Sequence, residues 1–123
     1  MIIIDWGDAD ETMIIMKFIG QWTTRQYRAA MVRRNLMILS KSHPVATIAD
    51  LRQSGSIPRD ILKTAITVAQ FNTPNSGQVS VITNHPIWSQ LSKLVMRFSG
   101  TDSSVIRFVH TVEDAYFYTL SHP

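Results

Sequence analysis

Two apolar runs near the N-terminus flank a polar segment. Residues 2–5 and 12–19 are rich in β-branched and apolar side chains, which favour strands, and residues 7–11 between them have the composition of a turn. This pattern predicts a β-hairpin. The part of the second run at 13–18 is apolar at nearly every position rather than at alternate positions, which indicates a central strand covered on both faces.

A capping box and a proline pair mark out the first helix. Thr23 and Gln26 have the spacing at which the threonine hydroxyl and the glutamine side chain each satisfy a free backbone amide at a helix start. The proline of the pair at 43–44 disfavours helical geometry in the residue before it. A helix is therefore predicted from Thr23 to about Ser42.

Each later helix has its own start signal. Pro58 suits a first turn because its missing amide costs nothing there, and Asp60 complements the positive end of the same helix, which should end near residue 71. His85–Pro86 opens the next helix, and Thr111 with Asp114 forms a second capping box. Core packing explains the apolar stripe of the helix that follows His85, which comprises Ile87, Trp88, Leu91, Leu94, Val95 and Phe98.

The order of the elements specifies the fold class. Strands are predicted over 45–51, 79–83 and 105–109, with polar loops over 52–56 and 72–77. The order β-β-α-β-α-β-α-β-α implies parallel neighbours joined through helices. We predict an α/β fold with a single mixed β-sheet, in which an opening β-hairpin is followed by three parallel strand-helix units, with four helices in all. A chain of 123 residues has the size of one domain, so we assign residues 1–123 to a single domain.

Composition narrows the class of protein. Apolar residues make up 45% of the chain and charged residues 17%, and no apolar run approaches the ~20 residues of a membrane span, so we expect a soluble globular domain without membrane insertion. The chain has no cysteine and no long apolar N-terminal stretch, which makes a cytoplasmic location the expectation. The net charge of +3 is too small to require a polyanionic partner.

Polar side chains gather where the parallel strands are predicted to end. Ligands of open α/β sheets bind beyond the carboxyl ends of the strands, and helix N-termini there attract anions. The residues at this edge are Asp50, Arg52 and Ser54, then Thr83, Asn84 and His85, and finally His110 and Thr111. They have two interpretations: helix caps and loop hydrogen bonds, or a site for a small anionic ligand or a nucleotide.

The sequence lacks the usual motifs of catalysis, metal binding and cofactor binding. The residue types of a catalytic triad are present in Ser56, His85 or His110, and Asp50. However, the chain has no G-x-S-x-G motif, which forms the nucleophile elbow of such enzymes. The four histidines have no metal-ligand spacing, and neither the dinucleotide fingerprint nor the phosphate loop occurs. We therefore predict no catalytic residue, no metal and no cofactor.

The first helix has arginines and two apolar faces. Its arginines point in different directions and have no aromatic partners, which favours a solvated surface over a nucleic-acid site: Arg25, Arg28, Arg33 and Arg34. One apolar face has Tyr27, Ala30, Met31 and Ile38, and the opposite face has Ala29, Val32, Leu36 and Leu39. The second face is either covered by another part of the chain or forms an interface. We predict a homodimer, with Trp22, Tyr27, Met31 and Leu36 as candidate interface residues.

The stretch D-L-x-x-S-G-S-x-P at 50–58, between a strand and a helix, together with the element order, resembles the STAS family of anti-sigma factor antagonists and sulfate transporter domains. The resemblance implies a SpoIIAA-like fold without catalysis, a protein partner, and a serine near that helix that a kinase phosphorylates. Ser56 and Ser54 are the candidate phosphoacceptors here. The family has an acidic residue next to its serine, whereas this chain has Gln53.

The resemblance favours a non-enzymatic regulatory or protein-interaction domain. The alternative function is an α/β module that binds a small anionic ligand or a nucleotide at the edge formed by the strand ends.

Overall fold

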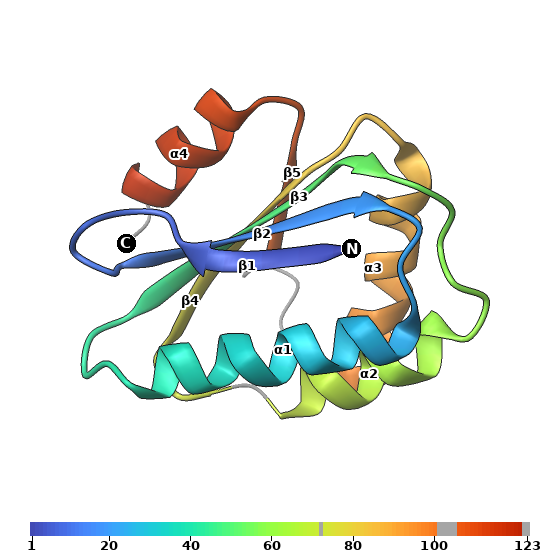
Figure 1. Ribbon diagram of the computed structural model, residues 1–123, viewed down its shortest axis with the longest axis horizontal. Coiled ribbons are helices and arrows are strands. Elements are labelled where there is room, and N and C mark those ends of the chain that lie inside the picture. Colours follow the sequence, from blue (N-terminus) through green and yellow to red (C-terminus); the bar gives the residue numbers. More distant parts are fainter. Residues whose placement is uncertain (72, 101–105, 122–123) are drawn as a thin grey trace.

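The strands and helices alternate in the order that the sequence predicts. The computed structural model describes residues 1–71, 73–100 and 106–121. Within these residues, five strands form one mixed sheet, and four helices lie on its two faces (Figure 1). The elements are β1 (Ile2–Trp6), β2 (Met13–Gly20), α1 (Thr24–Leu39), β3 (Val45–Ser54), α2 (Ile61–Gln70), β4 (Ser76–Ile82), α3 (Pro86–Ser99), β5 (Ile106–Val109) and α4 (Val112–Ser121). The predicted α/β class is confirmed.

The strands lie in the sheet in their sequence order, β1-β2-β3-β4-β5. The β1–β2 pair is antiparallel, as expected of the opening hairpin, and each later pair is parallel. Helices α1, α2 and α3 cover one face of the sheet, and α4 covers part of the other (Figure 1). All four parallel strands therefore end at the same edge, where the sequence predicted a polar cluster.

Strand β2 is buried on both faces, as its unbroken apolar run predicts. Ile14 and Met16 face the layer of α1, α2 and α3, with exposed fractions of 0% and 2%. Met13 and Ile15 point to the opposite face, where they pack in the cluster that contains Ala115 of α4. The alternation of a strand sends successive side chains to opposite faces, so a strand that is apolar at every position needs a cover on each.

Strand β3 continues through residues that the sequence assigned to a loop. Gln53 and Ser54 pair with Ile19 and Gly20 of β2, after a register shift that lies between Lys17 and Ile19. The polar composition of this segment correctly describes its exposure but not its backbone. Pairing with a neighbouring strand, which local sequence cannot show, overrides the loop preference.

Strand β4 also begins earlier than predicted, at Ser76 instead of residue 79. Ser76 pairs with Val45 at the start of β3, so the pairing extends β4 into the segment expected to be a loop. This boundary, like the end of β3, depends on the adjacent strand.

Helix α1 begins as predicted and ends earlier than predicted. The backbone amide of Thr23 donates to Gln26 Oε1 at 2.9 Å and the Gln26 amide donates to Thr23 Oγ1 at 3.1 Å, which confirms the capping box. The helix ends at Leu39 rather than at residue 42. Asn75, which precedes β4, donates from Nδ2 to the Ile38 carbonyl at 2.8 Å and to two later carbonyls, so a side chain distant in sequence satisfies the helix end.

Helix α2 begins later than its proline suggests. Its first residue is Ile61, and Pro58 lies in the preceding turn, where its carbonyl accepts from the Ile61 amide at 3.2 Å. Asp60 occupies the cap position without capping its own helix. Its carboxylate instead accepts from the Thr24 hydroxyl of α1 at 2.5 Å, so it joins the N-terminal ends of two helices.

The apolar stripe of α3 is only half buried, which corrects the expectation that core packing explains all of it. Val95 is buried, and Trp88 and Leu91 are half-buried against the core. In contrast, three members of the stripe are 41% to 61% exposed: Ile87, Leu94 and Phe98. The stripe is wider than the strip of helix surface that packs against the described residues.

Candidate functional site

The described part of the chain has two hollows that could form a site. The first, which we call the strand-end hollow, has a volume of about 520 Å³ and lies between the ends of β3 and β4. Five of the residues predicted at this edge line it, together with Ser56: Arg52, Ser54, Thr83, Asn84 and His85. Asp50, His110 and Thr111 do not line this hollow. The parallel topology thus brings together residues from two separate loops, as the sequence predicted.

The one arginine of the strand-end hollow already has a carboxylate partner. Arg52 donates from Nη2 to Asp50 Oδ2 at 2.7 Å and from Nε to Asp50 Oδ1 at 3.0 Å, and its backbone amide also donates to Oδ1. The side-chain hydrogen bond from Arg52 holds the pKa of the Asp50 carboxyl below its usual value and raises the pKa of Arg52. This pairing reduces the positive charge available to an anionic ligand.

Other polar residues of this edge, His85, Thr111 and His110, cap helices or bond to a backbone carbonyl. His85 Nδ1 accepts from the Ile87 amide at 3.3 Å, and Thr111 Oγ1 accepts from the Asp114 amide at 3.1 Å. His110 Nδ1 lies 3.1 Å from the Thr83 carbonyl oxygen. These contacts agree with the first of the two interpretations, helix caps and loop hydrogen bonds.

The two candidate phosphoacceptors occupy different positions from those expected. Ser54 is a residue of β3, and its Oγ accepts from Trp22 Nε1 at 2.8 Å and donates to the Gly55 carbonyl at 3.1 Å. Ser56 is exposed in a bend that precedes Asp60, the cap residue of α2. Neither serine therefore lies at the N-terminus of α2.

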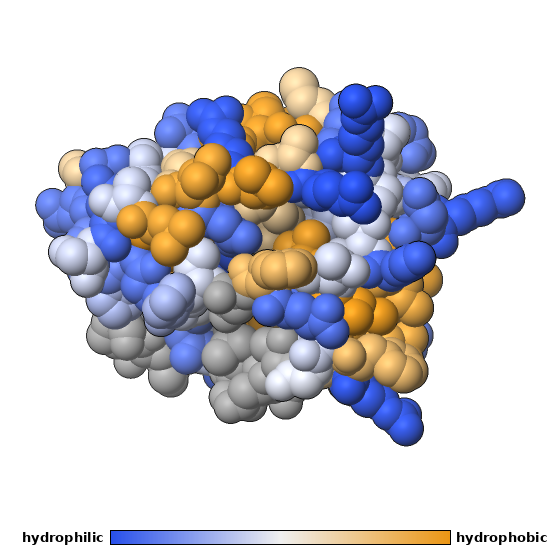
Figure 2. All heavy atoms as spheres, turned by 90° about the horizontal axis from the view of Figure 1, so that it is seen from below, coloured by the Kyte–Doolittle hydropathy of each residue, from blue (hydrophilic) through white to orange (hydrophobic). Residues whose placement is uncertain are grey.

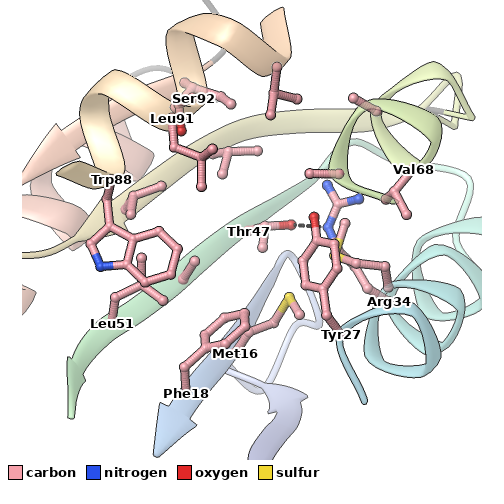
Figure 3. A pocket seen from close by; sticks show the side chains of 18 of the residues that line it. Met16, Phe18, Tyr27, Arg34, Thr47, Leu51, Val68, Trp88, Leu91 and Ser92 are labelled. Atoms are coloured by element: carbon pink, nitrogen blue, oxygen red, sulfur yellow. Dashed lines mark hydrogen bonds between the residues drawn. The ribbon is translucent and has the colours of Figure 1, made fainter. Parts of the chain in front are cut away.

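The second hollow, which we call the inner cavity, lies between the sheet and helices α1, α2 and α3 (Figure 3). Its volume is about 220 Å³. Most of its lining is apolar and comes from every element of this layer, including Met16, Phe18, Leu51, Met31, Val68 and Leu91. Protein interiors rarely leave empty spaces larger than a water molecule, so a cavity of this size is a candidate binding site.

An aromatic cluster lines the inner cavity, and one of its members, Trp88, also lines the strand-end hollow. Trp22 and Trp88 stack with ring centroids 6.1 Å apart and planes inclined by 20°, and Phe18 meets Trp22 edge-on at 5.1 Å. Leu51 and Trp88 line both the inner cavity and the strand-end hollow. Trp22 and Trp88 are therefore placed to report, through their fluorescence, on what enters the inner cavity.

Arg34 is the one charged side chain in the lining of the inner cavity as far as the structure describes it. It is 5% exposed and points from α1 towards the sheet (Figure 3). Its Nε donates to Thr47 Oγ1 at 2.8 Å, Nη1 to Asn35 Oδ1 at 3.0 Å and Nη2 to Ser76 Oγ at 2.9 Å. All three acceptors are neutral, and no carboxylate among the described residues forms an ion pair with it.

Burial changes the titration of two groups in the inner cavity. Burial lowers the pKa of Arg34 to about 10. Burial raises the pKa of Tyr27 to about 12, against a smaller opposing effect of the Arg34 charge. At neutral pH the cavity therefore holds a guanidinium cation beside a neutral phenol.

Arg34 was expected on a solvated surface with three other arginines of the same helix, and its burial corrects this expectation. The signal was present: Tyr27, Met31, Arg34 and Ile38 have the i, i+4, i+7, i+11 spacing of one helix face. Arg25, Arg28 and Arg33 are exposed, as expected.

The four candidate interface residues do not lie on one surface of the protein. Trp22 is 5% exposed, and Tyr27 and Met31 line the inner cavity, so these three are part of the interior rather than of an outer surface. Leu36 is 63% exposed on the opposite side of α1. The reason is the helix period, which sends residues 31 and 36 in opposite directions.

Searches for other kinds of site give no further candidate in the described part of the chain. Residues 1–71, 73–100 and 106–121 contain no group of three or more His, Asp or Glu side chains placed to hold a metal ion. None of the helices described there has the length and apolarity needed to cross a membrane.

Comparison with known proteins gives a match in structure but none in sequence. No protein family profile and no curated protein matches the sequence. The crystal structure of an uncharacterized protein of the DUF3478 family, with a SpoIIAA-like fold, from Shewanella loihica PV-4 is similar with a TM-score of 0.67. The match covers 97% of this chain and 92% of that one at 12% sequence identity. This likeness shows the fold and nothing beyond it: the chain has the SpoIIAA-like fold that its sequence predicted.

Proposed function

We propose that the protein is a non-enzymatic binding domain that takes up a small, mainly apolar molecule in the inner cavity. The observation that supports this function is an apolar cavity of about 220 Å³ between the sheet and helices α1, α2 and α3. An apolar cavity of about 150 Å³ can bind benzene. The inner cavity therefore has room for a compact ligand with an aromatic ring or a short alkyl chain.

A regulatory use of such a ligand is compatible with the fold. The neighbour with a SpoIIAA-like fold is itself uncharacterized, so the regulatory role stays a proposal. Helices α1, α2 and α3 both enclose the inner cavity and form the outer surface on that side of the sheet (Figure 1). A ligand that alters their packing would thereby alter a surface available to a protein partner.

The alternative site, at the strand ends, has weaker support. Its arginine is paired with Asp50, and the ring nitrogen Nδ1 of His85 is engaged with a backbone amide. An anion bound there would have to compete with the Asp50 carboxylate for Arg52. For this reason we favour the inner cavity over the strand-end hollow.

Addition of toluene or indole is expected to raise the melting temperature by several degrees and to change the tryptophan fluorescence. A ligand at 100 times its dissociation constant stabilises a protein by about 2.7 kcal/mol, and Trp22 and Trp88 line the inner cavity. Differential scanning fluorimetry and fluorescence titration measure the two effects.

A matched pair of variants locates the bound molecule. Ala65 of α2 lines the inner cavity and is 9% exposed, so Ala65→Leu should fill the cavity and abolish the ligand-induced shift. The same substitution at Ala29, on the exposed face of α1, should leave the shift intact. The proposal is wrong if toluene, indole and 3-phenylpropionate all leave both signals of the wild type unchanged near their solubility limits.

A second candidate function, self-association, is favoured by the outer face of α1. Val32, Leu36 and Leu39 follow the i, i+4, i+7 spacing and are 56%, 63% and 57% exposed. Apolar side chains gather on this underside of the molecule (Figure 2). A two-fold dimer would cover them, and a stable interface should bury at least ~1,000 Å² in total.

Sedimentation equilibrium at micromolar concentration should give a mass of about 28 kDa, twice the 14.0 kDa of the chain, if this face forms a dimer. Leu36→Glu should then give a folded monomer, because Leu36 is exposed and the added carboxylate would be buried only in the dimer. A mass of 14.0 kDa for the wild type at every concentration would contradict self-association.

A further inference from the structure

The inner cavity combines an apolar lining with one buried cation. Arg34 reaches from α1 across the layer to Thr47 of β3 and Ser76 of β4, so its guanidinium lies against the sheet and not in solvent. Each terminal nitrogen of a guanidinium has a second hydrogen beyond the one used in these bonds. Within the described residues, no further acceptor is bonded to those hydrogens.

Neutral partners leave the charge of Arg34 uncompensated. A buried charge is costly unless an opposite charge pairs with it, and the threonine, asparagine and serine oxygens around this guanidinium carry no formal charge. Arg52, in contrast, is exposed and has the Asp50 carboxylate 2.7 Å from its Nη2. Arg34 thus differs from Arg52 because it has no carboxylate partner among the described residues and faces a cavity in which an anion could bind.

The geometry points to the chemistry of the ligand. We propose, as a development of the function proposed above, that the inner cavity binds a monocarboxylate with a compact apolar tail, and that its carboxylate pairs with Arg34. A guanidinium presents parallel N–H groups that fit a carboxylate. The Tyr27 side chain points to the same part of the cavity, where its hydroxyl lies beside Arg34 (Figure 3). The phenol keeps its proton, which it can donate to the second carboxylate oxygen.

The size and charge of the cavity limit the ligand. A volume of about 220 Å³ exceeds the cavity of about 150 Å³ that holds benzene by roughly the space of a carboxylate and a short linker. Arg34 is the single cation among the described lining residues, so one negative charge is matched and a dianion is not. Arylalkanoates such as 3-phenylpropionate, and alkanoates of similar length, meet both conditions.

Isothermal titration of a matched acid and alcohol tests the role of the charge. The wild type should bind 3-phenylpropionate on the order of tenfold to a hundredfold more tightly than 3-phenylpropanol. Arg34→Met keeps a long side chain without the charge and should lose this preference, since the tail would still fit the cavity. The matched control is Arg33→Met, which removes an exposed arginine from the adjacent position and should keep the preference.

The outcomes separate this inference from the proposed function. Equal affinities for acid and alcohol in the wild type overturn the inference and leave the binding function standing. A preference for the acid that persists in Arg34→Met also overturns it. Failure of the wild type to bind the acid, the alcohol and toluene overturns both proposals. If Arg34→Met does not fold, Arg34→Lys replaces it. Lysine retains a positive charge but lacks the parallel N–H groups of a guanidinium, so the preference for the acid should fall several-fold. An unchanged preference in Arg34→Lys overturns the inference.

Discussion

Trp22→Ala is expected to lower the free energy of unfolding by about 3–5 kcal/mol. Trp22 is 5% exposed at the junction of β2 and α1, where its ring stacks on Trp88 and meets the edge of Phe18. Its indole Nε1 also donates to Ser54 Oγ at 2.8 Å. Truncation removes the apolar contacts and the hydrogen bond together and leaves a void beside the inner cavity. Urea denaturation followed by circular dichroism measures the loss.

The variant Trp22→Phe separates packing from hydrogen bonding. Phenylalanine keeps an aromatic ring near Trp88 and loses only the donor to Ser54, so its cost should be about 1–2 kcal/mol. A loss below about 1 kcal/mol for Trp22→Ala would mean that the aromatic cluster does not hold β2, α1 and α3 together, which would contradict the packing described above.

Ile14→Ala is expected to cost about 2–5 kcal/mol. Ile14 is fully buried in β2, on the face that packs against α1, α2 and α3, and truncation there leaves a cavity in the centre of the larger core cluster. Ile3→Ala is its matched control, because Ile3 lies in the paired strand β1 and is 44% exposed. The control should cost about 1 kcal/mol or less. Both values come from the same urea titration.

Similar losses for the two isoleucine variants would contradict this prediction. Such a result would mean that the exposed face of β1 is covered in solution, for example by a second copy of the chain. Sedimentation of Ile3→Ala at the same concentration would then distinguish a lost interface from a lost core contact.

The starts of α1 and α3 were predictable because they depend on a few neighbouring residues. The capping box of Thr23 and Gln26 and the His85 cap of α3 are contacts between residues two or three positions apart. The unbroken apolar run of β2 likewise predicted a strand covered on both faces. The order of the elements then predicted a mixed sheet. It also predicted that Arg52 and His85 lie at one edge of this sheet, because they follow parallel strands.

The ends of elements depended on partners distant in sequence. Helix α1 ends where Asn75 bonds to the Ile38 carbonyl and to two carbonyls that follow the helix, and β3 continues to Ser54 because it pairs with Gly20. Neither partner lies near enough along the chain to leave a local pattern. The helix period alone likewise could not say that Ile87 and Phe98 of α3 stay exposed while Val95 is buried.

The sequence by itself determined the α/β class and the starts of α1 and α3, because these depend on short-range spacing. Only the tertiary structure decided that Arg52 is neutralised by Asp50 and that Arg34 is buried without a carboxylate. The physical reason is that a charge is costly or harmless according to what surrounds it. The surroundings of Arg34 include Thr47 and Ser76, which the fold of the sheet brings to it from other parts of the chain.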